Sequence, residues 1–301
     1  MDTQLTRLTP IRARSAEKTE ACHPCLNAEA HKTRARMHLP VAPACNIGCR
    51  FCTRDLGTAD KRPGVAERLV KPDEAVGYVQ RALELCPELA VVGVAGPGDA
   101  LATSHALDAL SRVSNAFPDL VICLSTNGLR VADRIDEIDD AGVGSLTMTV
   151  NALDPAILSQ IVGWVALPGH KAVGEEAARI LIEAQTRGIR EAHARGIVIK
   201  VNTVLVTGVN DRHIGEIART VRALGADRYN VMPLIPNGEL ADFLAPTCQE
   251  VEAARAQAAS HIEVFRHCRQ CRADALGVVG GEDLSREFYG DGANMATFSH
   301  G

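Results

Sequence analysis

The stretch Ala44-Cys45-Asn46-Ile47-Gly48-Cys49-Arg50-Phe51-Cys52 sets three cysteines in a C-x3-C-x2-C spacing, directly after an apolar run that predicts a strand over 37–43. A cubane cluster of four irons normally takes four cysteine ligands. Three cysteines therefore leave one iron open, as a catalytic zinc keeps one position free for its substrate. The spacing predicts an iron-sulfur cluster that does chemistry, with Cys45, Cys49 and Cys52 as its ligands and as catalytic residues.

The spacing alone is also compatible with half of a zinc site, so its surroundings decide between the two. A Gly96-Pro97-Gly98 turn follows the next expected strand. In this context the motif resembles the signature of radical S-adenosylmethionine (SAM) enzymes. The resemblance implies that the open iron binds SAM, that an electron from the cluster breaks a carbon-sulfur bond, and that a deoxyadenosyl radical results.

The composition fits an ordinary globular protein. The 301 residues, 46% hydrophobic and 23% charged, suffice for one α/β barrel or two small domains. Only 3% are aromatic, so the core must consist of Ala, Val, Leu and Ile, which suits buried parallel strands. The net charge of −5 and pI near 6.1 provide no electrostatic footprint for nucleic acid or an anionic membrane. We expect neither partner.

The sequence also indicates where in the cell the protein is located and how its cysteines are used. No apolar run reaches the roughly 18 residues of a membrane span, and the N-terminus lacks the apolar centre of a signal peptide. We therefore expect a cytoplasmic protein. In a reducing compartment, ten cysteines indicate metal ligation or catalysis rather than disulfides.

Apolar runs alternate with helical patterns along the chain. Strands are expected at 37–43, 89–95, 120–125, 145–150, 197–205 and 228–234, and helices at 72–86, 104–116, 132–141, 154–163, 172–195 and 211–224. Strands joined by right-handed helical crossovers pair in parallel and curl. The predicted fold class is α/β, a radical-SAM type partial (β/α)6 TIM-like barrel with N- and C-terminal cluster-binding extensions. A full eightfold barrel is the alternative.

The two ends differ from the middle. Residues 1–21 are polar without periodicity and predict a mobile N-terminal arm, 22–283 form the barrel with its extensions, and the Gly-rich 284–301 predict a flexible tail. Thr247 and Glu250 fit a capping box that opens a helix running to about residue 261.

Two C-x2-C pairs flank the barrel, Cys22 with Cys25 upstream and Cys268 with Cys271 downstream. Two such pairs can close a structural zinc site. In a chain that already carries an iron-sulfur motif, auxiliary clusters are the favoured interpretation. Cys86 and Cys248 have no cysteine neighbours, and we interpret both as structural.

Two single residues complete the candidate ligands. Cys123 stands at the C-terminal end of the third strand and faces the same barrel mouth, although a small buried apolar residue is its plain alternative. His38 precedes Cys45 by seven residues on the first strand, where its neutral imidazole can project into the barrel as an iron ligand.

The expected SAM site lies where the barrel strands end. Gly96-Pro97-Gly98-Asp99 ends the second strand, and its lack of bulk lets backbone groups approach the methionine end of SAM. Neutral hydrogen-bonding residues end the third, fourth and fifth strands: Ser125, Thr126, Asn127, Asn151 and Asn202. Each could be turn chemistry by itself. Their shared edge, where barrel active sites assemble, supports a binding site.

With these residues in view, the chain resembles the NifB family of radical SAM enzymes over about residues 22–283. The matching segments are His23-Pro24-Cys25, Ala35-Arg36-Met37-His38, Val41-Ala42-Pro43-Ala44-Cys45-Asn46-Ile47, Arg62-Pro63-Gly64-Val65, Gly96-Pro97-Gly98-Asp99, Leu124-Ser125-Thr126-Asn127-Gly128-Leu129, Val201-Asn202-Thr203-Val204-Leu205, Met232-Pro233-Leu234-Ile235-Pro236 and His267-Cys268-Arg269-Gln270-Cys271-Arg272-Ala273-Asp274. The last segment is unusual outside this family.

The resemblance implies a function in nitrogenase cofactor assembly. Two [4Fe-4S] clusters, bound beside the SAM cluster, would be fused with a carbide and an added sulfide into an eight-iron precursor. One SAM would donate a methyl group to a cluster sulfide, and a second would yield the radical that abstracts hydrogen from it. By position, Cys25, Cys268 and Cys271 would hold one substrate cluster, while Cys123 and His38 would help to hold the other.

The resemblance also implies partners: SAM, iron-sulfur cluster donors, a reductant protein, and a downstream cofactor carrier or scaffold. The chain departs from the family in one segment. Family members typically carry a further cysteine six residues after the last motif cysteine, then a glutamate, whereas this chain has Thr58 and Asp60. Cys22 is a candidate replacement. Either the first cluster is held by fewer or different ligands, or the output of the enzyme is altered.

Two other functions remain open. One is a radical SAM enzyme with auxiliary clusters that acts on a peptide or small molecule. The other is a non-enzymatic iron-sulfur scaffold, against which the three-cysteine motif and the Gly-Pro-Gly turn argue. SAM cleavage separates the enzymes from the scaffold, and the iron count of the product separates the two enzymes.

Overall fold

The computed structural model of the chain describes residues 9–57 and 60–290. Its centre is a seven-stranded sheet with the order β11-β10-β7-β6-β5-β1-β12. Six strands are parallel: β1 (Ala35–His38), β5 (Leu89–Val94), β6 (Val121–Thr126), β7 (Val143–Thr149), β10 (Val198–Leu205) and β11 (Arg228–Pro233). β12 (Leu276–Val278) adds an antiparallel edge beside β1. The partial (β/α)6 barrel is confirmed, and all six predicted strands are present, although β1 ends at His38 rather than at residue 43.

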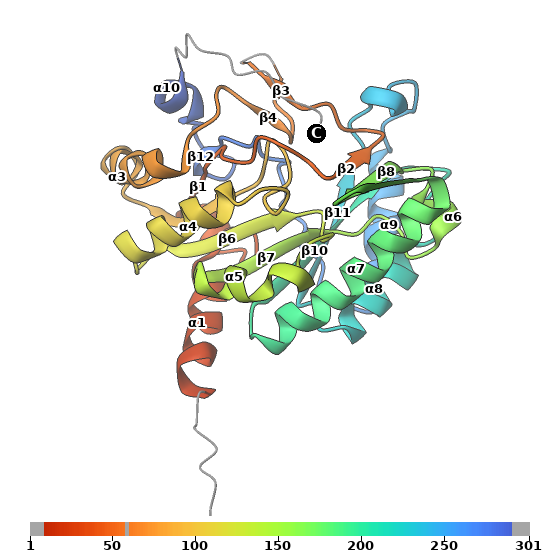
Figure 1. Cartoon of the computed structure of the whole chain (residues 1–301), viewed down its shortest axis with the longest axis horizontal. Helices are drawn as coiled ribbons and strands as arrows, with labels where there is room; N and C mark the ends of the chain where they lie inside the picture. Colours follow the sequence, from red (N-terminus) through yellow and green to blue (C-terminus); the bar gives the residue numbers. More distant parts are fainter. Residues whose placement is uncertain (1–8, 58–59, 291–301) are drawn as a thin grey trace, which may run out of the picture.

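Helices cover the outer face of this sheet (Figure 1). They are α3 (Ala75–Leu85) after the short helix η1 (Pro72–Glu74), α4 (His105–Ala116), η2 (Ala132–Arg134) with α5 (Ile135–Asp140), α7 (Gly174–Ala194), α8 (Ile214–Ala223) and α9 (Cys248–Ala259). The capping box of α9 is confirmed, because Thr247 Oγ1 accepts from Glu250 N at 3.2 Å while Glu250 Oε2 accepts from Thr247 N at 2.7 Å.

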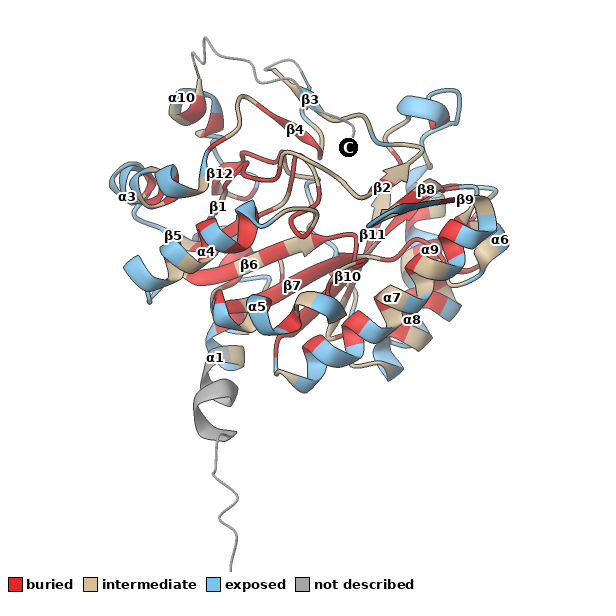
Figure 2. Cartoon of the chain, in the orientation of Figure 1, coloured by how far each residue is buried: buried red, intermediate tan, exposed pale blue. Residues whose placement is uncertain are grey.

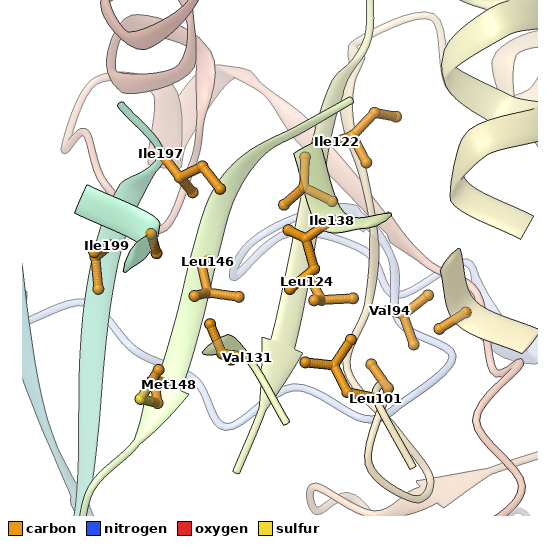
Figure 3. Close-up of a cluster of buried hydrophobic side chains, with 14 of the residues drawn as sticks. Val94, Leu101, Ile122, Leu124, Val131, Ile138, Leu146, Met148, Ile197 and Ile199 are labelled. Carbon is orange, nitrogen blue, oxygen red and sulfur yellow. The ribbon is translucent and has the colours of Figure 1, made fainter. Parts of the chain in front are cut away.

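The parallel strands alternate between an apolar outer face and a polar inner face. Successive side chains of a strand point to opposite faces. The outward residues are fully buried under the helices, where Figure 3 shows Leu124, Leu146, Met148 and Ile199 packed in one cluster. The intervening residues line a cavity inside the barrel: Cys123, Ser125, Thr147, Thr149, Lys200 and Asn202. Figure 2 shows the strands as the most buried part of the chain.

A second sheet lies beside the barrel and was not expected. It consists of β2 (Ile47–Cys49), β8 (Val162–Leu167) and β9 (His170–Val173), all antiparallel. The helix predicted over 154–163 is therefore wrong in its second half, since α6 (Pro155–Leu158) ends after one turn. Asp154 Oδ1 caps α6 by accepting from Ala156 N at 2.7 Å. The β-prone run that follows pairs instead with the cysteine motif.

Both ends contribute elements to the fold. α1 (Thr9–Cys22) lies within the range predicted to be a mobile arm, and its Thr19 is buried against Gly144. α10 (Ser285–Tyr289) lies within the predicted tail, and Tyr289 is fully buried with its hydroxyl donating to His38 O at 2.9 Å. Within the described residues, both ranges thus contain a helix that contacts the barrel, and the mobility of the arm and the tail stays a prediction. The rest of the predicted arm and tail, 1–8 and 291–301, lies outside the described residues.

Short elements complete the chain: α2 (Ala30–Thr33), β3 (Asp55–Leu56) paired with β4 (Val65–Ala66), and η3 (Gly238–Leu240). In the described part of the chain, we find no helix whose length and apolar character would let it span a bilayer.

Candidate active site and cluster-binding cavity

A single cavity of about 430 Å³ occupies the barrel interior. It receives side chains from all six parallel strands, from the cysteine motif and from both chain extensions. Its lining includes nearly all residues predicted for the site: Cys25, His38, Cys45, Cys49, Cys52, Pro97, Gly98, Asp99, Cys123, Ser125, Thr126, Asn127, Asn151, Asn202, Cys268 and Cys271. The fold thus brings seven cysteines from four separate segments to one space.

The motif loop, residues 44–52, is held on both sides. On one side the Gly-Pro-Gly turn binds its backbone, with Gly98 N donating to Ala42 O and Asp99 N to Ala44 O, both at 2.8 Å. On the other side β2 pairs with β8. A Cβ atom built at Gly98 would lie 2.0 Å from Ala44 O. Glycine is required at position 98 because the loop backbone fills the space where a Cβ atom would lie, and the approach of SAM to this turn stays a prediction.

Asp99 connects the turn to the end of β6. Its buried carboxylate accepts from Thr126 Oγ1 at 2.9 Å and from the backbone N–H of Asn127 at 2.6 Å. The Asn127 side chain in turn donates to Asn46 Oδ1 at 2.7 Å, next to Cys45. Three predicted SAM-site residues therefore hold the motif loop against the barrel, and they also line the cavity.

The asparagine side chains at the ends of the next strands are also engaged in hydrogen bonds within the protein. Asn151 Oδ1 accepts from Val204 N at 2.9 Å, and Asn202 Oδ1 accepts from Asn230 Nδ2 at 3.0 Å. Ser125 lines the cavity from β6. These contacts fix the rim of the barrel, and direct binding of SAM by these side chains stays a prediction.

Cys25, Cys123, Cys268 and Cys271 form what we call the four-cysteine end of the cavity. Burial raises the pKa of the Cys123 thiol to about 12, with the neighbouring Cys25 adding to the effect. The Arg36 guanidinium donates to Cys271 Sγ at 3.3 Å. Two chain extensions and β6 thus place four sulfur atoms together at one end of the cavity.

Lys200 also faces this end, from β10. Burial by itself lowers the pKa of its ammonium, but the neighbouring sulfur atoms, when ionised, raise it, and the net pKa is raised. The side chain is 5% exposed. A buried cation therefore stands among the candidate sulfur ligands.

The two histidines present different atoms to the cavity. His38 Nδ1 lies 2.8 Å from Arg272 O. A carbonyl oxygen can only accept, so Nδ1 is the donor and the neutral ring keeps a lone pair on Nε2. Burial lowers the pKa of His38 to about 4 and that of His23 to about 3. His38 is therefore neutral near pH 7, as an iron ligand must be.

His23 lies in one of the segments that resemble the NifB family, but it was not among the predicted site residues. Its Nδ1 accepts from Cys25 N at 3.0 Å, so the neutral ring carries its proton on Nε2. That Nε2 is buried and has no hydrogen-bond partner among the described residues. The ring lines the cavity and carries a buried donor that no described residue satisfies.

The donor set fits iron-sulfur clusters. Cys45 and Cys49 are half-buried and Cys52 is exposed within one loop, so three sulfur ligands meet an open space. Burial raises the pKa of Cys45 to about 11. Across residues 9–57 and 60–290, no three His, Cys, Asp or Glu side chains converge closely enough to hold a single metal ion.

Comparisons with known proteins identify the family. A profile described as the Radical SAM superfamily matches residues 39–221. The FeMo cofactor biosynthesis protein NifB of Methanocaldococcus jannaschii is 41% identical over 269 residues, which are 89% of this chain and 89% of that protein. The chain belongs to the NifB family of radical SAM enzymes. NifB of Klebsiella pneumoniae is also 41% identical, over 93% of this chain, but the chain spans only 61% of that longer protein.

Solved structures support the fold of this NifB-family chain. A radical SAM methyltransferase from Sphaerobacter thermophilus aligns with a TM-score of 0.54 at 22% identity, over 77% of this chain and 65% of the other. Methylornithine synthase aligns with a TM-score of 0.53 at 12% identity, over 84% and 69%. At such identities the likeness concerns the barrel alone.

A few positions differ between the predicted site residues and the residues that line the cavity. Cys22 and Gly96 are not among the residues that line the cavity, and Thr58 lies outside the described residues. Lys200 and Arg36 line the cavity but were not singled out. A signal for Lys200 was available, because it stands two residues before Asn202 on one strand and therefore shares its inward face.

Proposed function

We propose that this NifB-family chain is a radical SAM enzyme that fuses two [4Fe-4S] substrate clusters into an [8Fe-9S-C] precursor of the nitrogenase cofactor, with the carbide coming from a SAM methyl group. The observation that carries the proposal is the single cavity that joins the three-cysteine motif to four further cysteines. Substrate sulfur atoms held at the four-cysteine end would be enclosed in the same space as the SAM site. A cytoplasmic location and membership of the lyase class belong to the same proposal.

The motif residues would hold the resident cofactor. A four-iron cluster on Cys45, Cys49 and Cys52, with SAM on its open iron, would supply the one-electron cleavage of SAM. Asp99 and Asn127 keep the motif loop in place through their hydrogen bonds to Thr126 and Asn46. Val162 and Trp164 of β8 line the cavity beside this loop.

The remaining ligands would hold the two substrate clusters. Cys25, Cys268 and Cys271 would bind one, and Cys123 with His38 would help to bind the other. The lone pair on His38 Nε2 and its low pKa support ligation. Thr58 stands where relatives carry a cysteine, so the second cluster would have a replacement ligand or an open iron. Because Cys22 does not line the cavity, the proposal does not assign it this role.

The proposed partners are SAM, iron-sulfur cluster donors, a reductant protein and a carrier or scaffold for the product. Cleavage of SAM under reducing conditions would separate this enzyme from a passive cluster scaffold. Iron analysis of the product would separate it from a radical SAM enzyme that acts on a peptide or small molecule.

The deciding experiment counts iron and sulfide per chain after anaerobic reconstitution, with electron paramagnetic resonance (EPR) before and after SAM. Three clusters of four give roughly twelve irons. We expect about that number, with the auxiliary signals lost as SAM is consumed. Cys123→Ser should lose that change, whereas Cys248→Ser, at the exposed start of α9, should keep it. About four to eight irons, with auxiliary signals unchanged by SAM, would reject cluster fusion.

A further inference from the structure

Within the described part of the chain, Lys200 is a buried cation without a carboxylate partner. It is 5% exposed, and among the described residues its ammonium meets the Phe265 ring, 5.5 Å from the centroid, and the four-cysteine end, but no Asp or Glu. Burying an ammonium is costly unless it is paired and hydrogen-bonded. The fold therefore keeps a charge at this point although nothing among the described groups neutralises it by an ion pair.

Arg36 adds a second cation of the same kind. It is 8% exposed, and its guanidinium donates to Gly277 O and to Cys271 Sγ, the latter at 3.3 Å. Its Nε has no partner in the described structure. Arg272, by contrast, pairs with Asp274 at 2.9 Å and with Glu67 at 3.3 Å. Arg272 is thus neutralised by carboxylates, whereas Arg36 and Lys200, which face the cysteines, have no carboxylate partner among the described residues.

The placement of Lys200 follows from strand geometry. Its neighbours Ile199 and Val201 are fully buried on the outer, apolar face of β10. Lys200 and Asn202 point inward, where both line the cavity. The lysine therefore contributes nothing to the packing between sheet and helices, and its charge acts only inside the cavity.

The charge of a four-iron cluster suits this end of the cavity. A [4Fe-4S] core in its 2+ state carries one net negative charge when three thiolates bind it, and two after one-electron reduction. A buried cation close by stabilises both states and stabilises the more negative one more strongly. His23, whose Nε2–H has no partner among the described residues, lines the same cavity.

We propose that Lys200 is a positioning residue whose ammonium, with Arg36 beside it, retains an anionic iron-sulfur substrate cluster at the four-cysteine end and favours the reduced form of that cluster. The inference rests on the proposed function, since it requires a cluster at that end. It identifies a residue that binds no iron and yet controls how the substrate is held.

The test compares Lys200→Met and Lys200→Arg with Lys171→Met, an exposed lysine on β9, each in a background in which Cys45, Cys49 and Cys52 are alanine. That background removes the motif cluster, so that the remaining iron and EPR signal report the auxiliary clusters. Iron per chain is measured after gel filtration, and the reduced fraction is followed in a redox titration.

We expect Lys200→Met to retain less auxiliary iron and to lower the reduced-to-oxidised ratio at a given potential about tenfold, which is 59 mV for a one-electron couple. Lys200→Arg and Lys171→Met should match the parent. Without iron, Lys200→Met should melt at the same temperature as the parent or higher, because it removes an uncompensated buried charge. A purely structural lysine would instead lower the melting temperature.

Unchanged iron content and unchanged potential in Lys200→Met would overturn the role of Lys200 and leave the proposed function standing. Absence of auxiliary iron already in the parent would overturn the proposed function together with this inference. If Lys200→Met fails to fold while Lys200→Arg matches the parent in melting temperature, the lysine is a structural residue and the inference is wrong.

Discussion

At the scale of single residues, the three motif cysteines have the most direct test. Cys45→Ala, Cys49→Ala and Cys52→Ala should each lose SAM cleavage, because removal of one sulfur ligand leaves the resident cluster two cysteines. Cleavage is measured as release of deoxyadenosine under reducing conditions. Cys248→Ala, which changes an exposed cysteine outside the cavity, serves as the control. Normal cleavage in any of the three motif variants would defeat the assignment of the site.

His38 predicts a pH dependence. Its pKa falls from the ordinary 6.5 to about 4 in the folded chain, mainly through burial. Between these values the unfolded chain binds a proton that the folded chain does not. The contribution of His38 to the free energy of unfolding is therefore fully present above pH 6.5. It is lost as the pH falls toward 4, by up to about 1.4 kcal/mol per pH unit.

His38→Gln should flatten this dependence by about one proton. The measurement is urea unfolding of the iron-free protein at pH 7, 6 and 5. Groups shared by the variant and the parent, such as Asp99, cancel in the comparison. Equal slopes for His38→Gln and the parent would show that the histidine is accessible to protons in the folded state.

At the scale of elements, the contact between the Gly-Pro-Gly turn and the motif loop decides the geometry of the site. Gly98→Ala would force a methyl group to within 2.0 Å of Ala44 O, which is backbone and cannot rotate away. We expect a loss of about 1–3 kcal/mol of stability and reduced iron at the motif. Gly77→Ala, on the exposed side of α3 with nothing within 4 Å, should instead stabilise by roughly 0.5–1 kcal/mol. Thermal unfolding and iron content measure both.

The capping box of α9 gives a second prediction for an element. Thr247→Ala removes the side-chain oxygen that accepts from Glu250 N, and should cost about 1 kcal/mol of unfolding free energy. Thr247→Ser keeps this oxygen and should cost less. SAM cleavage should be unaffected in both variants, since α9 lies outside the cavity lining. Equal stability of the alanine and serine variants would mean that the cap contributes little in this setting.

At the scale of the whole molecule, the C-terminal segment closes the barrel on the side of β1, where β12 pairs with that strand. Tyr289 stacks on Tyr78, with ring centroids 5.6 Å apart, and donates to His38 O at 2.9 Å. Tyr289→Ala should cost roughly 3–5 kcal/mol by opening a cavity. Tyr289→Phe, which keeps the ring, should cost about 1 kcal/mol. Denaturant unfolding distinguishes them, and equal losses would show that the hydrogen bond rather than ring packing fastens the C-terminal segment.

Sequence alone was sufficient for features that depend on local pattern. The alternation of apolar strands and amphipathic helices predicted the six parallel strands, and the cap at Thr247 marked the start of α9. The cysteine spacing and the segments around Gly96 and Cys268 pointed to the family. Each of these signals is contained in a few neighbouring residues. It can therefore be recognised without knowing which segments of the chain are in contact in the fold.

Tertiary structure decided what depends on contacts between distant segments. Only the fold shows that Gly98 accommodates the backbone at Ala44, that residues 162–167 pair with the cysteine motif, and that Lys200 stands among cysteines from three other parts of the chain. It also shows that α1 and α10 contact the barrel, although neither segment has a sequence pattern that requires it. The free energy of such contacts is shared between residues far apart in sequence, so no single segment carries their signal.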